Sequence, residues 1–281
     1  MTVRVITDST CDLPASVVAD LGIQVLPLYI HAEGKDYLDG IDITREQFYA
    51  RLPEFKEHPR TAVPSMLKFR SMFDDLAEKG ASEVLSIHIS VTLSAVADVA
   101  RAAAAETSSV PVTVFDSRSL SLGTGFLVQT AAELAKAGHT VKEIVEKLED
   151  QVKRTYVSAA LDTLKFLKRS GRMNGVVSTI GELLDIKPIL KMVDGVSGIE
   201  KVRTHKRAVA RLIEMIKAHS PLEKIAFLYS GSISNAQQLM AEVKDLIPDK
   251  QTWIEIINPV LGAHIGPGVV GFVSISKPTE S

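Results

Sequence analysis

The sequence predicts an α/β protein of two lobes: an N-terminal lobe around a parallel sheet, and a smaller C-terminal α+β lobe whose sheet is mixed or antiparallel. Three observations lead to this prediction. Apolar β runs alternate with helical periods in the first half of the chain, and strands follow one another around a hairpin signal in the second half. The length of 281 residues is also near the upper limit that one hydrophobic core serves.

The alternation in the first half is typical of a parallel sheet with helices on both faces. Strands are expected at Val3–Thr7, Gly22–Ile30, Glu83–Ser90 and Val112–Phe115, with a short helix after Pro14. Longer helices are expected at Ser65–Lys79, Ser94–Glu106, Ser121–Lys136 and Val141–Lys153. Residues 34–57 are polar and rich in turn formers, and they form an excursion with one short helix at Thr44–Leu52.

The second half has a different character. Strands are expected at Thr155–Leu161, Ile186–Val193, Gly198–Arg203, Ile225–Tyr229, Trp253–Ile257 and Val269–Ile275, and helices at Lys206–Ala218 and Ile233–Leu246. The dipeptide Asp194-Gly195 between two of these strands is a strong hairpin signal. We place the boundary near Arg154, so that the lobes cover residues 1–154 and 155–281. Because no Pro-rich or Ser-rich linker separates them, the lobes are expected to pack directly.

The composition narrows the choice of ligand. Aromatic residues make up 5% of the chain, so the core must be aliphatic. An aliphatic interior can accept an alkyl chain, whereas few rings are available to stack on bases. The net charge of −2 gives no general reason to expect nucleic acid or an anionic membrane as a partner.

One apolar stretch, Ile256–Ser276, is long enough to span a membrane. It contains two prolines, four glycines, Asn258 and His264, which a helix in hydrocarbon would not favour. We therefore expect no stable membrane insertion and interpret the stretch as a strand, a glycine-rich loop and a strand. The single Cys11 and the strand that begins at Val3, with no apolar leader before it, favour a cytoplasmic location.

Four strand-to-helix junctions carry hydroxyl groups: DSTCDLP (8–14), TAVPS (61–65), SVTLS (90–94) and DSRSLSLG (116–123). A Ser or Thr at one such junction usually caps a helix, and Asp8 can equally serve as a structural turn. Four junctions along one sheet edge together predict a pocket of neutral donors and helix N-termini that suits a carboxylate or a phosphate. Thr61 and Ser94 are among the hydroxyl-bearing candidates at these junctions. The possible pocket edge comprises Asp8, Ser9, Ser90, Ser117 and, from the second half, Gly262.

Two further motifs lie in the second half. In LGAHIGPG (261–268), three glycines and a proline surround His264, the one side chain there that ionises near neutral pH. In LKRSGRM (167–173), Arg172 follows Gly171 and can bind an anion with two hydrogen bonds, although a solvated surface arginine is as good an interpretation.

Catalytic and metal-binding signatures are missing. The sequence has no nucleophile elbow, no phosphate-binding P-loop motif, no His-Glu-x-x-His and no pair of Cys-x-x-Cys, so we predict neither catalytic residues nor a metal site. A G-x-G-x-x-G pattern at Gly266, Gly268 and Gly271 precedes a strand instead of opening a helix, which argues against dinucleotide binding.

These segments, in this order, resemble the DegV family of lipid-binding proteins, which includes the fatty-acid-binding subunits of bacterial fatty acid kinase. The likeness covers essentially the whole chain. It is carried by DSTCDLP, by the TxxPS core of TAVPS, by DSRSLSLGTG, by LKRSGRM, by the KPIL…DG segment over residues 187–195, and by GAHIGPG.

The resemblance implies a long-chain fatty acid whose carboxylate sits between the two lobes. It implies that Thr61 and Ser94 hold the carboxylate, and that His264 and Arg172 lie near the head group or on the surface that faces a kinase. Relatives usually have TSQPS and LSGT where this chain has TAVPS and Leu93-Ser94-Ala95-Val96, so a more apolar surround of the head group is expected.

The resemblance thus implies a non-catalytic carrier that needs no cofactor and presents its fatty acid to a separate ATP-dependent kinase subunit, which would form an acyl phosphate. Two alternatives stay open at this point. The first is a carrier or sensor of another small anion with no kinase partner. The second is a hydrolase that uses the hydroxyl-lined sheet edge and His264.

Overall fold

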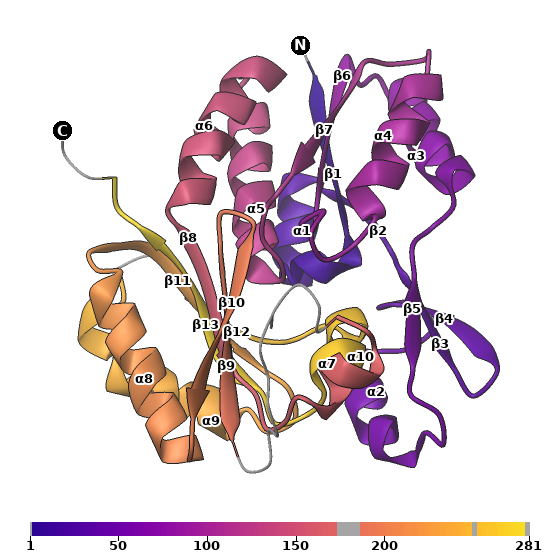
Figure 1. Ribbon diagram of the computed structural model, residues 1–281. Helices are drawn as coiled ribbons and strands as arrows, with labels where there is room; N and C mark the ends of the chain where they lie inside the picture. Colours follow the sequence, from indigo (N-terminus) through magenta and orange to yellow (C-terminus); the bar gives the residue numbers. More distant parts are fainter. Residues whose placement is uncertain (1, 173–185, 249–251, 279–281) are drawn as a thin grey trace.

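In the computed structural model, which describes residues 2–172, 186–248 and 252–278, a four-stranded parallel sheet forms the N-terminal part of the molecule (Figure 1). Its strands lie in the order β2-β1-β6-β7. Their bounds are Gln24–Leu26 (β2), Val3–Asp8 (β1), Glu83–His88 (β6) and Val112–Asp116 (β7). All three pairings are parallel, which confirms the predicted α/β architecture.

Helices cover both faces of this sheet. Helices α3 (Met66–Glu78) and α4 (Val96–Glu106) pack against each other on one face, and α5 (Leu122–Lys136) lies with α6 (Val141–Lys153) and α1 (Ala15–Leu21) on the other (Figure 1). In α4 the buried residues recur at helical spacing and are small, so the helix can approach the sheet closely: Val96, Ala97, Ala100 and Ala103. Helix α6 begins with the capping box formed by Thr140 and Glu143.

A six-stranded sheet forms the C-terminal part, in the order β10-β9-β8-β13-β11-β12. Its strands are Thr155–Ala160 (β8), Lys187–Val193 (β9), Val196–Val202 (β10), Leu222–Tyr229 (β11), Trp253–Ile256 (β12) and Val270–Ser276 (β13). Only β11 and β12 pair in parallel within these six strands, so the sheet is mixed, as predicted. The β9–β10 hairpin turns at Asp194 and Gly195, which have φ of 45° and 78° as a type I′ turn requires.

The two faces of this second sheet have different neighbours. Helices α8 (His205–Ala218) and α9 (Ser234–Glu242) cover one face and share a hydrophobic cluster with it that includes Ile216, Phe227 and Leu239. The opposite face turns toward the parallel sheet, and its residues join a single cluster with the core of the first half. Arg154 lies between α6 and β8, so the chain changes sheet at the position where we placed the boundary. The division into two lobes that fold as separate units stays a prediction.

Two local expectations were wrong. The single strand expected at Gly22–Ile30 is two strands, β2 and β3 (Tyr29–Ala32), because Pro27 cannot donate a hydrogen bond within a strand. The excursion contains helix α2 (Arg45–Arg51), as expected, but its neighbours β4 (Lys35–Leu38) and β5 (Arg60–Ala62) pair with β3 in a small antiparallel sheet.

The glycine-rich loop expected before the last strand is also wrong in part, since it contains helix α10 (Pro259–Ile265). Asn258 caps the helix by accepting a hydrogen bond from the backbone of Leu261, and Pro259 occupies the first helical position, where no N–H is needed. The glycines of this stretch suggested a loop, yet Asn258 and Pro259 together specify a helix start.

A buried polar cluster joins α10 to the first strand. Asp12 accepts hydrogen bonds from the backbone and side-chain nitrogens of Asn258 (2.9 and 3.0 Å) and from Ser121 (2.5 Å), and Arg45 lies 3.4 Å away. Burial raises the pKa of Asp12, and the Arg45 charge and these hydrogen bonds oppose that shift. Residues 246 positions apart in the chain are thus held together inside the protein.

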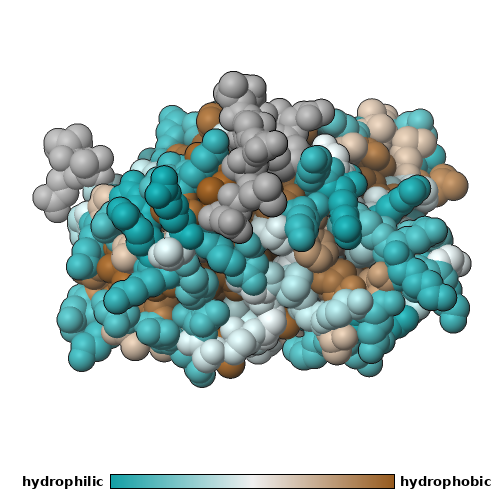
Figure 2. All heavy atoms as spheres, turned by 60° about the horizontal axis from the view of Figure 1, so that its bottom comes forward, coloured by the Kyte–Doolittle hydropathy of each residue, from teal (hydrophilic) through white to brown (hydrophobic). Residues whose placement is uncertain are grey.

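None of the helices in the described part of the chain is long and apolar enough to cross a membrane. Hydrophilic residues dominate the face shown in Figure 2, and the hydrophobic residues between them form separate small patches.

The buried cluster yields a stability prediction. Asn258→Ala removes the cap of α10 and the side-chain hydrogen bond to the buried carboxylate of Asp12, although the backbone N–H of residue 258 still donates to it, so we expect the free energy of unfolding to fall by about 2–4 kcal/mol. Urea denaturation measures this change. Asn235→Ala in α9 is the control, because Asn235 makes no side-chain hydrogen bond among the described residues, and an equal loss in both variants would contradict the role given to the cluster.

Candidate functional site

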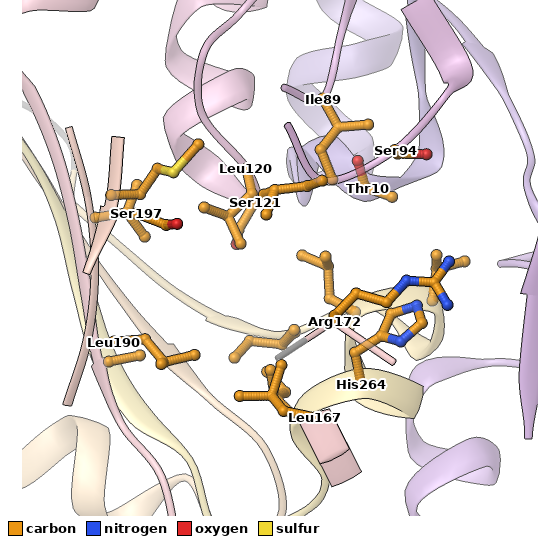
Figure 3. A pocket seen from close by; sticks show the side chains of 18 of the residues that line it. Thr10, Ile89, Ser94, Leu120, Ser121, Leu167, Arg172, Leu190, Ser197 and His264 are labelled. Carbon is orange, nitrogen blue, oxygen red and sulfur yellow. The ribbon is translucent and has the colours of Figure 1, made fainter. Parts of the chain in front are cut away.

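A cavity of about 250 Å³ lies between the two sheets, closed at one side by α7 (Lys165–Arg169) and α10 (Figure 3). Its wall is mainly aliphatic and includes Ile89, Leu120, Val157, Leu190, Leu228 and Leu261. No Phe, Tyr or Trp contributes to the lining in the described part of the chain. The cavity is larger than the roughly 150 Å³ apolar cavity that binds benzene, so it can hold a sizeable apolar group.

Polar groups gather at one end of the cavity. Oγ1 of Thr61 and Nε2 of His264 are 3.0 Å apart and hydrogen-bonded, although the two residues are 203 positions apart in the chain. Ser94 and Arg172 line the same cavity, and Figure 3 shows the Arg172 side chain beside that of His264. The four main candidates from the sequence therefore lie around one cavity.

His264 is neutral at physiological pH. Burial lowers its pKa to about 4, and the positive charge of Arg172 acts in the same direction. Its Nδ1 atom is buried and has no hydrogen-bond partner among the described residues. Because a buried polar atom without a partner is costly, His264 must be held in place by its surroundings.

Glycines allow α10 to lie close to its neighbours, and this fixes His264. At Gly262 an added Cβ would lie 2.6 Å from the hydroxyl oxygen of Tyr49 in α2. At Gly266, which has φ of 75°, it would lie 2.3 Å from the ring of Phe166 in α7. Glycines therefore flank His264 because helix α10 packs closely between α2 and α7, where larger side chains would not fit.

Strand β5 positions Thr61, the other partner in the hydrogen bond with His264. Thr61 pairs with Ile30 of β3, and the strand alternation directs Thr61 toward α10. Ser94 precedes α4, which begins at Val96 and not at Ser94 as expected, so that its hydroxyl is outside the helix. The half-buried Ser94 lies near the positive end of the α4 dipole.

The residues expected at the pocket edge do not line the cavity: Asp8, Ser9, Ser90, Ser117 and Gly262. Each is engaged elsewhere. Ser9 accepts a hydrogen bond from the backbone of Leu28, Ser90 bonds to Thr92, and Ser117 bonds to Thr124. Gly262 faces Tyr49, as described above. These hydroxyls stabilise the turns at the sheet edge, which was the alternative interpretation. Met173, the last residue of the LKRSGRM motif, lies outside the described residues.

Asp8 does not line the cavity, but its hydrogen bonds hold two residues of the cavity wall. Its carboxylate accepts hydrogen bonds from Thr10 and from the backbone of Ile89, both of which line the cavity. It is also 2.9 Å from Nδ1 of His88, and Nε2 of His88 is 2.7 Å from the hydroxyl of Ser86. Burial raises the pKa of Asp8, but these hydrogen bonds and His88 lower it more.

The Ser86–His88–Asp8 chain has the connectivity of a catalytic triad, but its three side chains are fully buried and do not border the cavity. A substrate cannot reach the Ser86 hydroxyl in this arrangement. The chain therefore acts here as a structural network that holds Thr10 and Ile89. The described residues also contain no group of three or more His, Cys, Asp or Glu side chains that could hold a metal ion.

The sequence interpretation missed four polar residues of the lining: Thr10, Ser121, Lys191 and Ser197. Thr10 and Ser121 lie inside motifs that were singled out, so only their orientation was unknown. Lys191 and Ser197 belong to the β9–β10 hairpin, and nothing in a strand's sequence tells which face meets a ligand.

The His264 pKa predicts how stability changes with pH. An unfolded His has a pKa near 6.5, so between pH 6.5 and about 4 the unfolded chain binds a proton that folded His264 does not. The melting temperature should therefore fall as the pH falls through this window. Because His219 has the same shift for the same reason, His264→Asn should remove only part of the fall. Thermal melts across this range check it, and identical slopes for the variant and the wild type would contradict it.

Comparison with known proteins identifies the family. The model of the DegV family, which is described as a family of uncharacterised proteins, matches residues 2–277. A DegV domain-containing protein of Deinococcus radiodurans is 36% identical over 276 residues, which cover 96% of this chain and 97% of that protein. One from Streptomyces coelicolor is 33% identical and covers 98% and 99% of the two chains.

Solved structures agree over the whole chain. A DegV family protein of Thermus thermophilus, described by its fatty acid binding, is 33% identical with a TM-score of 0.90 and covers 99% of this chain and 100% of its own. DegV of Bacillus subtilis, described as a fatty acid binding protein, is 29% identical with a TM-score of 0.91 and the same coverage. This chain therefore belongs to the DegV family.

Proposed function

We propose that this protein binds one long-chain fatty acid in the cavity, with the carboxylate at Thr61 and Ser94, and that it presents this head group to a separate kinase. The single observation that carries the proposal is the polarity of the cavity: most of its wall is aliphatic, and the hydrogen-bonded pair Thr61 and His264 lies at one end. A molecule with an alkyl tail and one polar head matches that arrangement.

The tail would supply most of the affinity. Burial of apolar surface is worth about 0.8 kcal/mol per CH₂ group, so a chain of many such groups has a gross driving force of roughly 10 kcal/mol or more. The absence of aromatic rings from the described lining favours a flexible alkyl chain over a planar ligand. The head group would then set orientation more than affinity.

The head group would be held by hydroxyls. Neutral His264 can donate its Nε2 proton to Thr61, which leaves the Thr61 hydroxyl proton free to be donated to a carboxylate oxygen. Ser94 can donate to the same carboxylate, and the N-terminus of α4 adds a favourable dipole. Hydrogen bonds to a charged group are worth about 1.5–3 kcal/mol each. The fatty acid binding described for the similar proteins of Thermus thermophilus and Bacillus subtilis supports this assignment.

Presentation to a kinase is supported by the charges at the head-group end. Arg172 is exposed, lines the cavity and uses one guanidinium nitrogen to bond the backbone of Ser170. Lys168 and Arg169 precede it, both in the last turn of α7. These cations suit a phosphoryl group that approaches the carboxylate, and the protein needs neither a catalytic residue nor a cofactor of its own. Since ATP would be the phosphoryl donor, the pair would work in the cytoplasm.

The first test of this proposal concerns ligand retention. Thr61→Ala with Ser94→Ala removes both proposed donors, so we expect the rate of fatty acid loss to rise at least about tenfold, as the loss of one hydrogen bond to a charge requires. Mass spectrometry of the denatured protein before and after dialysis measures the retained acid. Ser65→Ala is the control, because Ser65 is exposed and caps α3 without a side-chain hydrogen bond. Equal retention in the double variant and the control would contradict the proposed site, and a wild type without any fatty acid would contradict the function.

The second test separates binding from presentation. Arg172→Ala should leave the bound acid in place but lower the rate at which a fatty acid kinase subunit forms acyl phosphate, by about tenfold or more, because one phosphate-facing cation is lost. Phosphate transfer from labelled ATP measures the rate. Arg207→Ala in α8, an exposed arginine outside the cavity lining, is the matched control. If both variants were phosphorylated at the wild-type rate, the role given to Arg172 would be wrong.

A further inference from the structure

The end of the cavity opposite His264 and Arg172 is formed by the β9–β10 hairpin. Met192 and Ser197 pair across the two strands, and both line the cavity. Figure 3 shows Ser197 across the cavity from Arg172 and His264, with its side chain directed toward the interior. A linear ligand anchored at Thr61 would therefore point its far end at this hairpin.

Successive side chains of β10 point alternately to the cavity and to solvent. Ser197 faces the cavity, whereas its neighbour Val196 is 72% exposed and faces solvent. Met192 is 3% exposed and lies in the main hydrophobic core. Leu190, Lys191 and Gly198 of the hairpin also line the cavity, and the pair of Ser197 and Met192 adds one small side chain and one long, adaptable side chain to this wall.

The hairpin is fastened to the parallel-sheet part of the molecule. The backbone N–H of Gly195 donates to the carbonyl of Arg118 (2.8 Å), and the Arg118 guanidinium forms an ion pair with Asp194 (3.0 Å). Arg118 also pairs with Glu149 of α6, and the hydroxyl of Thr92 lies 3.5 Å from the carbonyl of Gly195. The end wall is therefore held against the loop after β7, against α6 and against the segment of residues 90–94, which carries Ser94.

We propose that Ser197 and Met192 determine the length of the fatty acid that the protein retains, and that Arg118 is a positioning residue that keeps their wall at a constant distance from the head-group end. The inference rests on the proposed function, since it needs a carboxylate anchored at the other end. With both ends fixed, a chain that is too long must bend or leave its carboxylate site. A chain that is too short leaves apolar wall uncovered.

The experiment compares chain lengths in four proteins. Wild type, Ser197→Leu, Met192→Ala and Val196→Leu are each stripped of lipid, incubated with an equimolar mixture of saturated acids of about 12 to 20 carbons, and washed. The retained acids are then extracted and quantified by mass spectrometry. Val196→Leu is the matched control, because it adds a large side chain to the same strand on the solvent side.

Ser197→Leu should shift the retained distribution to acids shorter by about two carbons and reduce retention of the longest acids about tenfold, since roughly two CH₂ groups lose their place. Met192→Ala should shift it in the opposite direction, and it remains informative if Ser197→Leu fails to fold. Val196→Leu should match wild type. Unchanged distributions in both cavity variants would overturn the inference while leaving the proposed function intact, and a wild type that retains no acid would overturn both.

A final variant tests whether Arg118 holds the β9–β10 hairpin in position. Arg118→Ala removes the ion pairs to Asp194 and Glu149 but keeps its backbone contact, so the wall should move more freely. We expect a broader distribution of retained lengths centred near the wild-type value, and a narrower one again in Arg118→Lys. A purely structural role would lower the melting temperature without widening the distribution, and that result would overturn the part assigned to Arg118.

Discussion

The structure depends on one buried contact, the pairing of Asp12 with Asn258. Asp12 ends the first strand-to-helix junction of the parallel part, and Asn258 begins α10. A buried carboxylate is tolerated only when its oxygens are satisfied, and here Asn258, Ser121 and Arg45 satisfy them. The contact therefore sets where α10 starts, and α10 carries His264. The distance between Thr61 and His264 follows from an interaction that touches neither of them.

The cavity exists because two sheets face each other with aliphatic side chains and are joined around it at several points. One junction is the cluster at Asp12, and another is the ion pair between Arg118 and Asp194 at the hairpin tip. Close packing normally removes such a space, since interiors are as dense as organic crystals. Here the surrounding contacts are polar, directional and partly charged, so the sheets cannot slide together to fill it. The polar contacts around the cavity, such as the Asp12 cluster and the Arg118–Asp194 ion pair, thus keep the two sheets apart and preserve an apolar cavity between them.

Much of the fold was predictable, because alternation of strands and helices leaves a periodic pattern that one chain suffices to read. The four main candidates, which all line the cavity, came from a different kind of signal: Thr61, Ser94, Arg172 and His264 stand in motifs that resemble a known family. The errors have physical causes. The hydroxyls of Ser9, Ser90 and Ser117 could point either to a ligand or to a nearby backbone group, and only tertiary packing decides between the two. Helix α10 was interpreted as a loop because Gly262 lies inside the helix for close packing against Tyr49, and only Gly266 and Gly268, which follow the helix, have the positive φ of turn glycines.

Two hydrogen-bonded groups of side chains in this molecule contain a histidine, and they differ in their access to the cavity. Asp8, His88 and Ser86 form a complete acid–base relay, yet they are fully buried and face no cavity. His264 faces the cavity, but burial and Arg172 keep it neutral, and its partner is a threonine whose hydroxyl has no neighbouring carboxylate relay in the described residues. The Ser86–His88–Asp8 chain cannot be reached from the cavity. The pair of Thr61 and His264 borders the cavity but contains no base that could accept a proton near neutral pH. A site built in this way can orient a head group and leave its chemistry to a second protein.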